Sequence, residues 1–202
     1  MKVRVLFLTL FLTMYFSVSA QDSYQESIAE YLTLNGTTQK YEGEYAKMFV
    51  LLKKHFSKSD ISEATWTSLQ TNKKQSIKEI QTKLAVSYKE HFSEKDIQKM
   101  TAFYKTDAGK QLATHPTKLS PEQNQAVAEL HESGFGKKNE KKQQEVMKAV
   151  NRIASNWSRD LYLEKVNALK AKGFVPDYEI TETNKTIGKG KNAQASLIKS
   201  QN

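Results

Sequence analysis

The chain contains no cysteine, which excludes disulfides, thiol catalysis, cysteine-ligated zinc or iron–sulfur sites and a lipid anchor on cysteine. It has only 3 prolines and 8 glycines among 202 residues, and so few turn signals favour long helices over many short strands. The hydrophobic fraction of 38% is low for a globular protein but too high for an unfolded chain. The composition therefore predicts a folded, mainly helical protein without covalent cross-links.

The first twenty residues have the pattern of a cleavable signal peptide. Lys2 and Arg4 form a positive start, an apolar run of about a dozen residues follows, and small residues end at Ala20. The run is too short for a membrane-spanning helix, which needs about 20 apolar residues. We therefore expect cleavage after Ala20 and a periplasmic or secreted chain without a transmembrane segment. The absence of cysteine fits a bacterial envelope better than an animal secretome.

Apolar residues recur at steps of three and four along most of the remaining chain, as in amphipathic helices. Hydroxyl caps and glycines predict helices that start at Ser23, Thr37 or Thr38, Asp60, Ser93 and Ser120, and a last long helix that ends at Gly173. The third of these is expected to continue from residue 60 to residue 91. No strand is predicted. The fold class is therefore all-α, an antiparallel helical bundle in one domain over residues 21–174, followed by a flexible polar tail over residues 175–202.

A segment of the chain recurs at an offset of 27 residues. Both copies contain a hydroxyl cap and an apolar helix, then two adjacent residues (an aromatic pair in the first copy, Leu-His in the second), a second hydroxyl and Gly-Lys. The first copy carries Phe92, Ser93, Phe103, Tyr104, Thr106, Gly109 and Lys110, and the second copy, over about residues 119–137, carries Leu119, Ser120, Leu130, His131, Ser133, Gly136 and Lys137. A hairpin that cannot bury its own apolar face must stack on a neighbour. We therefore interpret the motif as packing in a repeated helical-hairpin unit, with hydroxyls capping a new turn and glycines permitting close helix approach.

The motif from Phe92 to Lys110 resembles the signature of the bacterial domain-of-unknown-function family 2059. The signature covers about residues 83–113, and a looser similarity runs over most of residues 22–137. Asp107 stands where the family often has proline, and Gln111 stands where it often has a second basic residue. The resemblance implies a secreted, all-helical envelope protein of Gram-negative bacteria, and it brings no catalytic residues.

No arrangement typical of a catalytic or metal site stands out. The four histidines are isolated from one another in the sequence, and none belongs to a His-Glu-x-x-His pair. His55 and His91 each precede Phe-Ser at a predicted helix end, which favours capping or surface roles. No Gly-x-Ser-x-Gly motif is present. We therefore predict no cofactor and no metal, and an enzyme is the least favoured class.

Two surfaces are candidates for binding. The first is a row of helix-spaced aromatic residues, namely Tyr24, Tyr31, Tyr41, Tyr45, Phe49 and Phe56. Such a row is most often ordinary core, but it could line a groove for an apolar ligand. The second is a basic run at the start of the last helix, comprising Lys137, Lys138, Lys141 and Lys142, with Arg152 and Lys165 among the basic residues further along. It is either a solvated face or a contact for anionic lipid or polysaccharide.

The net charge is +9, and it becomes +7 once Lys2 and Arg4 are removed with the signal. This positive charge agrees with an anionic partner. Nucleic acid is not favoured, because the chain is predicted to be exported and has no binding motif. The sequence thus predicts a non-enzymatic envelope module that binds a protein or an anionic surface. The alternative is a carrier of an apolar small molecule in a groove between helices, and a hydrolase-type enzyme ranks third.

Overall fold

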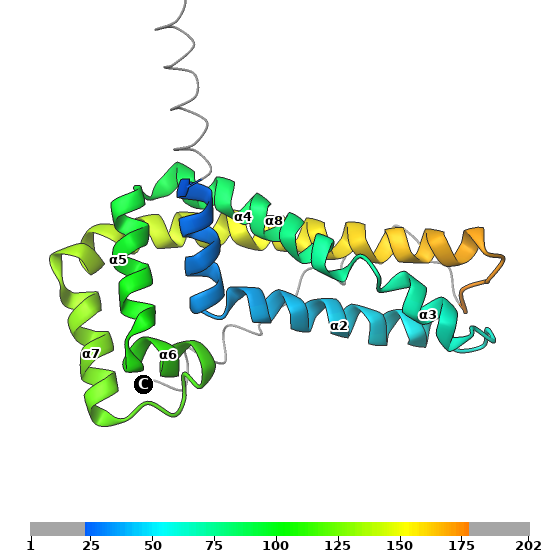
Figure 1. Ribbon diagram of the computed structural model, residues 1–202, viewed down its shortest axis with the longest axis horizontal. Coiled ribbons are helices and arrows are strands. Elements are labelled where there is room, and N and C mark those ends of the chain that lie inside the picture. Colours follow the sequence, from blue (N-terminus) through cyan, green and yellow to red (C-terminus); the bar gives the residue numbers. More distant parts are fainter. Residues whose placement is uncertain (1–22, 178–202) are drawn as a thin grey trace, which may run out of the picture. The chain divides into compact units, whose positions relative to one another are not determined.

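A computed structural model describes residues 23–177 of the protein (Figure 1). Residues 23–34 are helical, and seven further helices follow. They are α2 (Thr37–His55), α3 (Glu63–Leu69), α4 (Lys73–His91), α5 (Glu94–Lys105), α6 (Asp107–Thr114), α7 (Pro121–Glu132) and α8 (Gly134–Ala171). No strand occurs in this part of the chain, so the predicted all-α fold class is confirmed. The predicted signal peptide and most of the predicted tail lie outside the described residues.

Two helices end at glycines, as the sequence predicts. Gly36 and Gly173 have φ angles of 82° and 90°, a region that glycine enters without the steric cost of a Cβ atom. After α8, the Phe174 amide donates to the Leu169 carbonyl and the Gly173 amide donates to the Lys170 carbonyl. This pair of bonds is the Schellman motif, and it satisfies carbonyls that the end of a helix leaves without partners.

The prediction of one helix over residues 60–91 is wrong. Ser62, not Asp60, caps α3, and the helix ends at Leu69 before α4 begins at Lys73. Residues 70–73 are all polar, and the Thr71 hydroxyl donates to the Ser68 carbonyl. Side chains of this kind compete with the helical backbone for its hydrogen bonds. Lys73, the one charged residue on the predicted apolar stripe, was the signal of a break.

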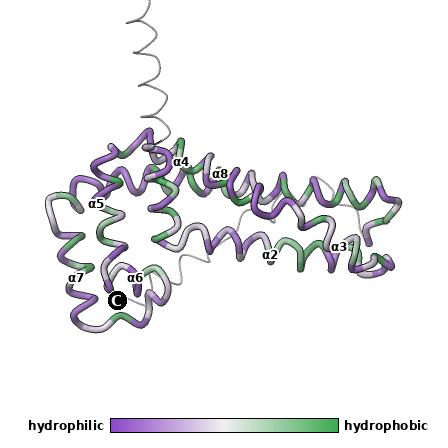
Figure 2. The backbone as a smooth tube through the Cα atoms, viewed as in Figure 1, coloured by the Kyte–Doolittle hydropathy of each residue, from purple (hydrophilic) through white to green (hydrophobic). Residues whose placement is uncertain are grey.

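The chain divides into two compact units. Within the described residues, the first unit comprises residues 23–44 and 73–154, and the second comprises residues 45–72 and 155–177. The core of the first unit contains five side chains with no exposed surface, those of Ile28, Leu32, Ile80, Leu84 and Ile97. The core of the second unit contains Leu52, Phe56, Trp66, Leu161 and Leu169. Hydrophobic and hydrophilic residues alternate along the longer helices, as burial of one helix face requires (Figure 2). The single domain over residues 21–174 remains a prediction.

The aromatic row predicted from the sequence is almost entirely core. Five of its six rings, those of Tyr31, Tyr41, Tyr45, Phe49 and Phe56, are at most 5% exposed. Tyr24 is half-buried, and its hydroxyl donates to the Phe92 carbonyl over 2.5 Å. Burial raises the pKa of Tyr41 and of Tyr45 to about 12. The rings therefore do not form an exposed apolar row.

Candidate functional site

The first copy of the sequence motif builds a corner between α5 and α6. Ser93 caps α5 in a capping box, because its hydroxyl accepts from the Asp96 amide and the Asp96 carboxylate accepts from the Ser93 amide. Thr106 ends α5 and also caps α6, with its hydroxyl accepting from the Gly109 amide over 3.1 Å. A Cβ atom on Gly109 would lie 2.2 Å from the Phe103 carbonyl oxygen. Only glycine therefore fits this corner without displacing backbone.

The second copy builds a corner with the same local contacts between α7 and α8. Ser120 and Gln123 form the capping box, and the Ser133 hydroxyl accepts from the Gly136 amide over 3.0 Å. A Cβ atom on Gly136 would lie 2.3 Å from the carbonyl oxygen of His131. The glycines face the end of the preceding helix in both places. The repeated hairpin as a unit remains a prediction.

The motif side chains do not converge on a cleft. Tyr104 packs edge-on against Tyr31, with ring centroids 5.9 Å apart, and Lys110 Nζ lies 3.9 Å from an oxygen of Asp107. The positions otherwise differ widely in exposure: Phe92 and Gly109 are buried, Phe103 and Tyr104 are half-buried, and Ser93, Thr106 and Lys110 are exposed. We therefore keep the packing role of the motif as a proposal.

Lys142, one of the four predicted anion contacts, is engaged within the protein. Its Nζ lies 3.2 Å from a carboxylate oxygen of Asp96 and 5.7 Å from the ring centroid of Phe92. Burial raises the pKa of Asp96, but hydrogen bonds from Ser93 and Lys142 outweigh this effect and hold the pKa below its ordinary value. Lys142 therefore ties α8 to the capping box of α5.

Four of the exposed cations of α8 form a row that extends beyond the predicted run. We call this row the α8 basic stripe, and it comprises Lys137, Lys141, Lys148 and Arg152. At 100° per residue the four positions fall within a sector of about 60°, on the side of the helix opposite the buried Val146 and Val150. All four are exposed, and none forms an ion pair within residues 23–177.

The sequence prediction and the stripe share only Lys137 and Lys141. Lys138 is exposed but lies about 100° around the helix from Lys137, so it flanks the stripe. The sequence prediction omitted Lys148, and it named Arg152 without recognising that this residue lies on the same side of the helix as Lys137 and Lys141. Applying the helical period to charged residues, as is usual for apolar residues, would have found both.

Lys165, predicted as part of the basic balance, is buried in the second unit. Only 3% of the residue is exposed, and its Nζ donates to Asn72 Oδ1 over 2.9 Å and to Glu164 Oε1 over 2.8 Å. The Tyr45 hydroxyl lies 3.5 Å from the same Asn72 oxygen. A buried ammonium needs such partners because moving a charged group out of water costs on the order of several kcal/mol unless other groups replace its hydration.

His55 is fully buried, so a surface role is wrong for this residue, although it stands at the end of α2 as predicted. Its Nδ1 shares a hydrogen bond of 2.6 Å with the Tyr162 hydroxyl, and the two rings stack. His91 Nδ1 lies 2.8 Å from the Ser87 carbonyl oxygen within the same helix. Within residues 23–177, no three His, Cys, Asp or Glu side chains are grouped to hold a metal ion.

Asp177 fastens the segment after α8 to the end of α2. Its amide donates to the His55 carbonyl, and its carboxylate accepts from the Ser57 hydroxyl over 2.6 Å and from the amides of Ser57 and Lys58. The hydrogen bond from the Ser57 hydroxyl is the main cause that lowers the pKa of Asp177. These contacts place a pH-dependent clip in the second unit.

Acidification should open this clip. Because the folded state lowers the Asp177 pKa below the unfolded value of about 3.9, its stabilisation is complete above that value and is lost as the pH falls through the lowered pKa. We expect the amide proton shifts of Ser57 and Lys58 to titrate together below about pH 4 in an NMR series. Asp177→Asn should abolish both titrations. A midpoint at or above the unfolded value would contradict the assignment.

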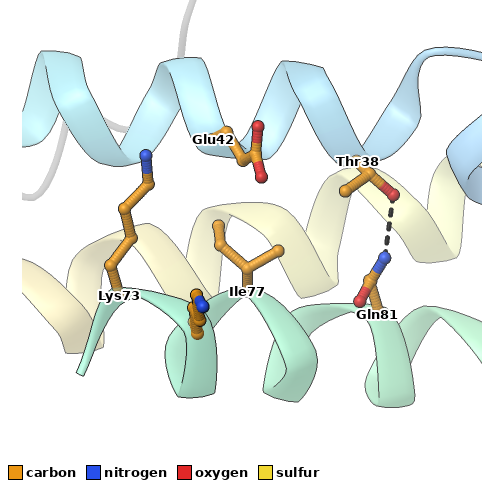
Figure 3. Close-up of a pocket in the computed structure, with 6 residues that line it drawn as sticks. Thr38, Glu42, Lys73, Ile77 and Gln81 are labelled. Atoms are coloured by element: carbon orange, nitrogen blue, oxygen red, sulfur yellow. Dashed lines mark hydrogen bonds between the residues drawn. The ribbon is translucent and has the colours of Figure 1, made fainter.

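A groove lies between α2 and α4 in the first unit (Figure 3). It has a volume of about 340 Å³ and is lined by Thr38, Glu42, Lys73, Lys74, Ile77 and Gln81. Gln81 donates to the Thr38 hydroxyl over 2.8 Å, a bond that Figure 3 shows across the two helices. Three of the six lining residues are charged, and none is aromatic. Because no ring of the predicted aromatic row lines this groove, it is not the groove that the sequence predicted for an apolar ligand.

Between residues 23 and 177, every helix is too short or too polar to cross a lipid bilayer. Neither the curated proteins nor the solved structures contain a significant match to the chain. Residues 78–129 match the model of a family described as an uncharacterized protein conserved in bacteria (DUF2059). The match spans the motif from Phe92 to Lys110, so the resemblance found in the sequence is confirmed. Over the segment from α4 into α7, the chain is thus similar to domain-of-unknown-function family 2059 of bacteria.

Proposed function

We propose that this protein is a non-enzymatic envelope module that binds an anionic partner through the α8 basic stripe. The observation that carries the proposal is the stripe itself, four exposed cations in one register of a helix whose opposite side is buried. The predicted export signal and the bacterial family resemblance support a place in the envelope. The mature charge of +7 would attract such a partner over a distance that salt limits.

The stripe is costly in the free protein. Lys137 and Lys141 are four residues apart, as are Lys148 and Arg152, and like charges at this spacing destabilise a helix by about 0.2–0.5 kcal/mol per pair. Lys142 lies in the same helix segment but is turned inward, and it has Asp96 as a partner. Bound anionic groups would relieve the repulsion along the stripe, which favours binding.

The other two candidate functions receive less support. An apolar carrier needs exposed rings or an apolar groove, but five of the six side chains of the aromatic row are core, and the groove between α2 and α4 is lined by three charged residues and no ring. A hydrolase needs converging catalytic groups. The motif residues differ in exposure and converge on no cleft in the part of the chain that the structure describes.

Neutralising the stripe should weaken binding to anionic surfaces. The variant Lys137→Gln, Lys141→Gln, Lys148→Gln, Arg152→Gln loses four exposed contacts worth roughly 0.5 kcal/mol each, so its affinity should fall about 30-fold. Binding of the chain without residues 1–20 would be measured by interferometry on a heparin surface and on a phosphatidylglycerol bilayer. The function requires stripe-dependent binding to at least one of them.

A matched control removes the same charge elsewhere. Lys78, Lys83, Lys95 and Lys118 are exposed and lie outside α8, so their replacement by glutamine leaves the stripe intact at an equal net charge. This control should lose less than about threefold in affinity, since only long-range attraction changes. Equal losses in the two variants would show that net charge alone drives binding, and the proposed site would be wrong.

A further inference from the structure

We infer that the partner of the α8 basic stripe is a linear polyanion, a phosphate- or sulfate-bearing chain that lies along α8. The inference rests on the proposed function and specifies its partner. A lipid bilayer and a nucleic acid are the competing anionic partners, and the geometry and composition of the stripe argue against each.

The cations are arranged in one dimension. Lys137 and Lys141 are about 6 Å apart along the helix axis, Lys148 follows about 10 Å further on, and Arg152 about 6 Å after that. The row is thus about 23 Å long and narrow, because its members share one sector of the helix. A linear polyanion presents its charges in such a row, whereas a bilayer presents them over a plane.

The flanks of the stripe lack the apolar part of a bilayer contact. Helices that lie on membranes insert apolar side chains next to their cationic face. Gln144 and Asn151 border the stripe on one side and Glu145 on the other, and all three are exposed. The apolar face of this part of α8, with Val146 and Val150, is buried in the protein and cannot enter a bilayer.

The stripe also lacks the parts that recognise bases. Proteins that bind single-stranded nucleic acid stack bases on aromatic side chains, in addition to pairing phosphates with cations. Residues 137–152 contain no aromatic residue. Charge is therefore the main feature that this surface offers, which favours a polyanion without bases.

The test compares inorganic polyphosphate with phosphatidylglycerol vesicles and with single-stranded DNA of similar charge. Four cation–phosphate contacts predict that log Kobs for polyphosphate falls with log salt with a slope of about −3 between about 0.05 and 0.3 M NaCl. The single variant Lys141→Gln should reduce that slope by about 0.7. At equal anion concentration, vesicles should bind at least about tenfold more weakly than polyphosphate, and DNA should bind no more tightly.

The outcomes separate this inference from the proposed function. Stripe-dependent binding that favours vesicles, or that favours DNA, would overturn the linear polyanion and leave an anionic partner in place. No binding to any probe at the lowest salt would overturn both the linear polyanion and the proposed function. An equal loss in the control variant of Lys78, Lys83, Lys95 and Lys118 would also overturn both. Circular dichroism and melting temperature check that each variant is folded. Because the replaced side chains are exposed, the circular dichroism should match that of the unmodified chain, and the melting temperature should be no lower.

Discussion

Gly109→Ala should lower the free energy of unfolding by about 3 kcal/mol, the upper end of the usual cost of overpacking. The added Cβ would lie 2.2 Å from the Phe103 carbonyl oxygen and 2.5 Å from the Tyr104 Cα, and both are backbone atoms that cannot rotate away. The corner between α5 and α6 would have to open. For a chain of this size the loss corresponds to roughly 10 °C in melting temperature. Urea and thermal denaturation followed by circular dichroism would measure it.

Gly43→Ala is the matched control for this substitution. Gly43 lies within α2, and a Cβ atom added there would meet nothing within 4 Å. The same change should therefore stabilise the chain by about 0.5–1 kcal/mol, because alanine loses less backbone entropy in a helix. If Gly109→Ala and Gly43→Ala have the same effect, the close approach at the α5–α6 corner is not what requires glycine.

Asn72→Ala should lower the free energy of unfolding by about 2–3 kcal/mol, because hydrogen bonds to charged groups are strong. Asn72 Oδ1 accepts from the ammonium of Lys165, a residue that is only 3% exposed. Removing the amide leaves the ammonium its contact with Glu164 Oε1, at 2.8 Å. Chemical denaturation would measure the loss.

A double-mutant cycle distinguishes the lost partner from lost packing. Lys165→Met removes the charge while keeping a long apolar side chain, and the Glu164 carboxylate is not left buried because its side chain is 55% exposed. In that background, Asn72→Ala should cost less than about 1 kcal/mol. Additive costs would show that Asn72 stabilises the α3–α4 connection without help from Lys165.

The helix ends were predictable because they depend on neighbours in the sequence. The capping box of Ser120 and Gln123 joins residues three apart, and the Schellman motif at Gly173 joins residues three and five apart. The break between α3 and α4 was missed because apolar spacing continues from Leu69 to Ile77 on either side of it. Periodicity records which face is apolar, and it does not record where polar side chains interrupt the backbone.

The functional surface depended on contacts that no local pattern contains. Lys141 and Lys142 are adjacent and identical in type, yet Lys142 pairs with Asp96, which is 46 residues away. Lys165 is buried because Asn72, 93 residues away, supplies an acceptor. Sequence alone determined the all-α class, most helix ends and the glycine corners, since these follow from backbone geometry over a few residues. Tertiary structure alone decided which lysines are exposed, because burial and pairing are set by side chains that folding brings together.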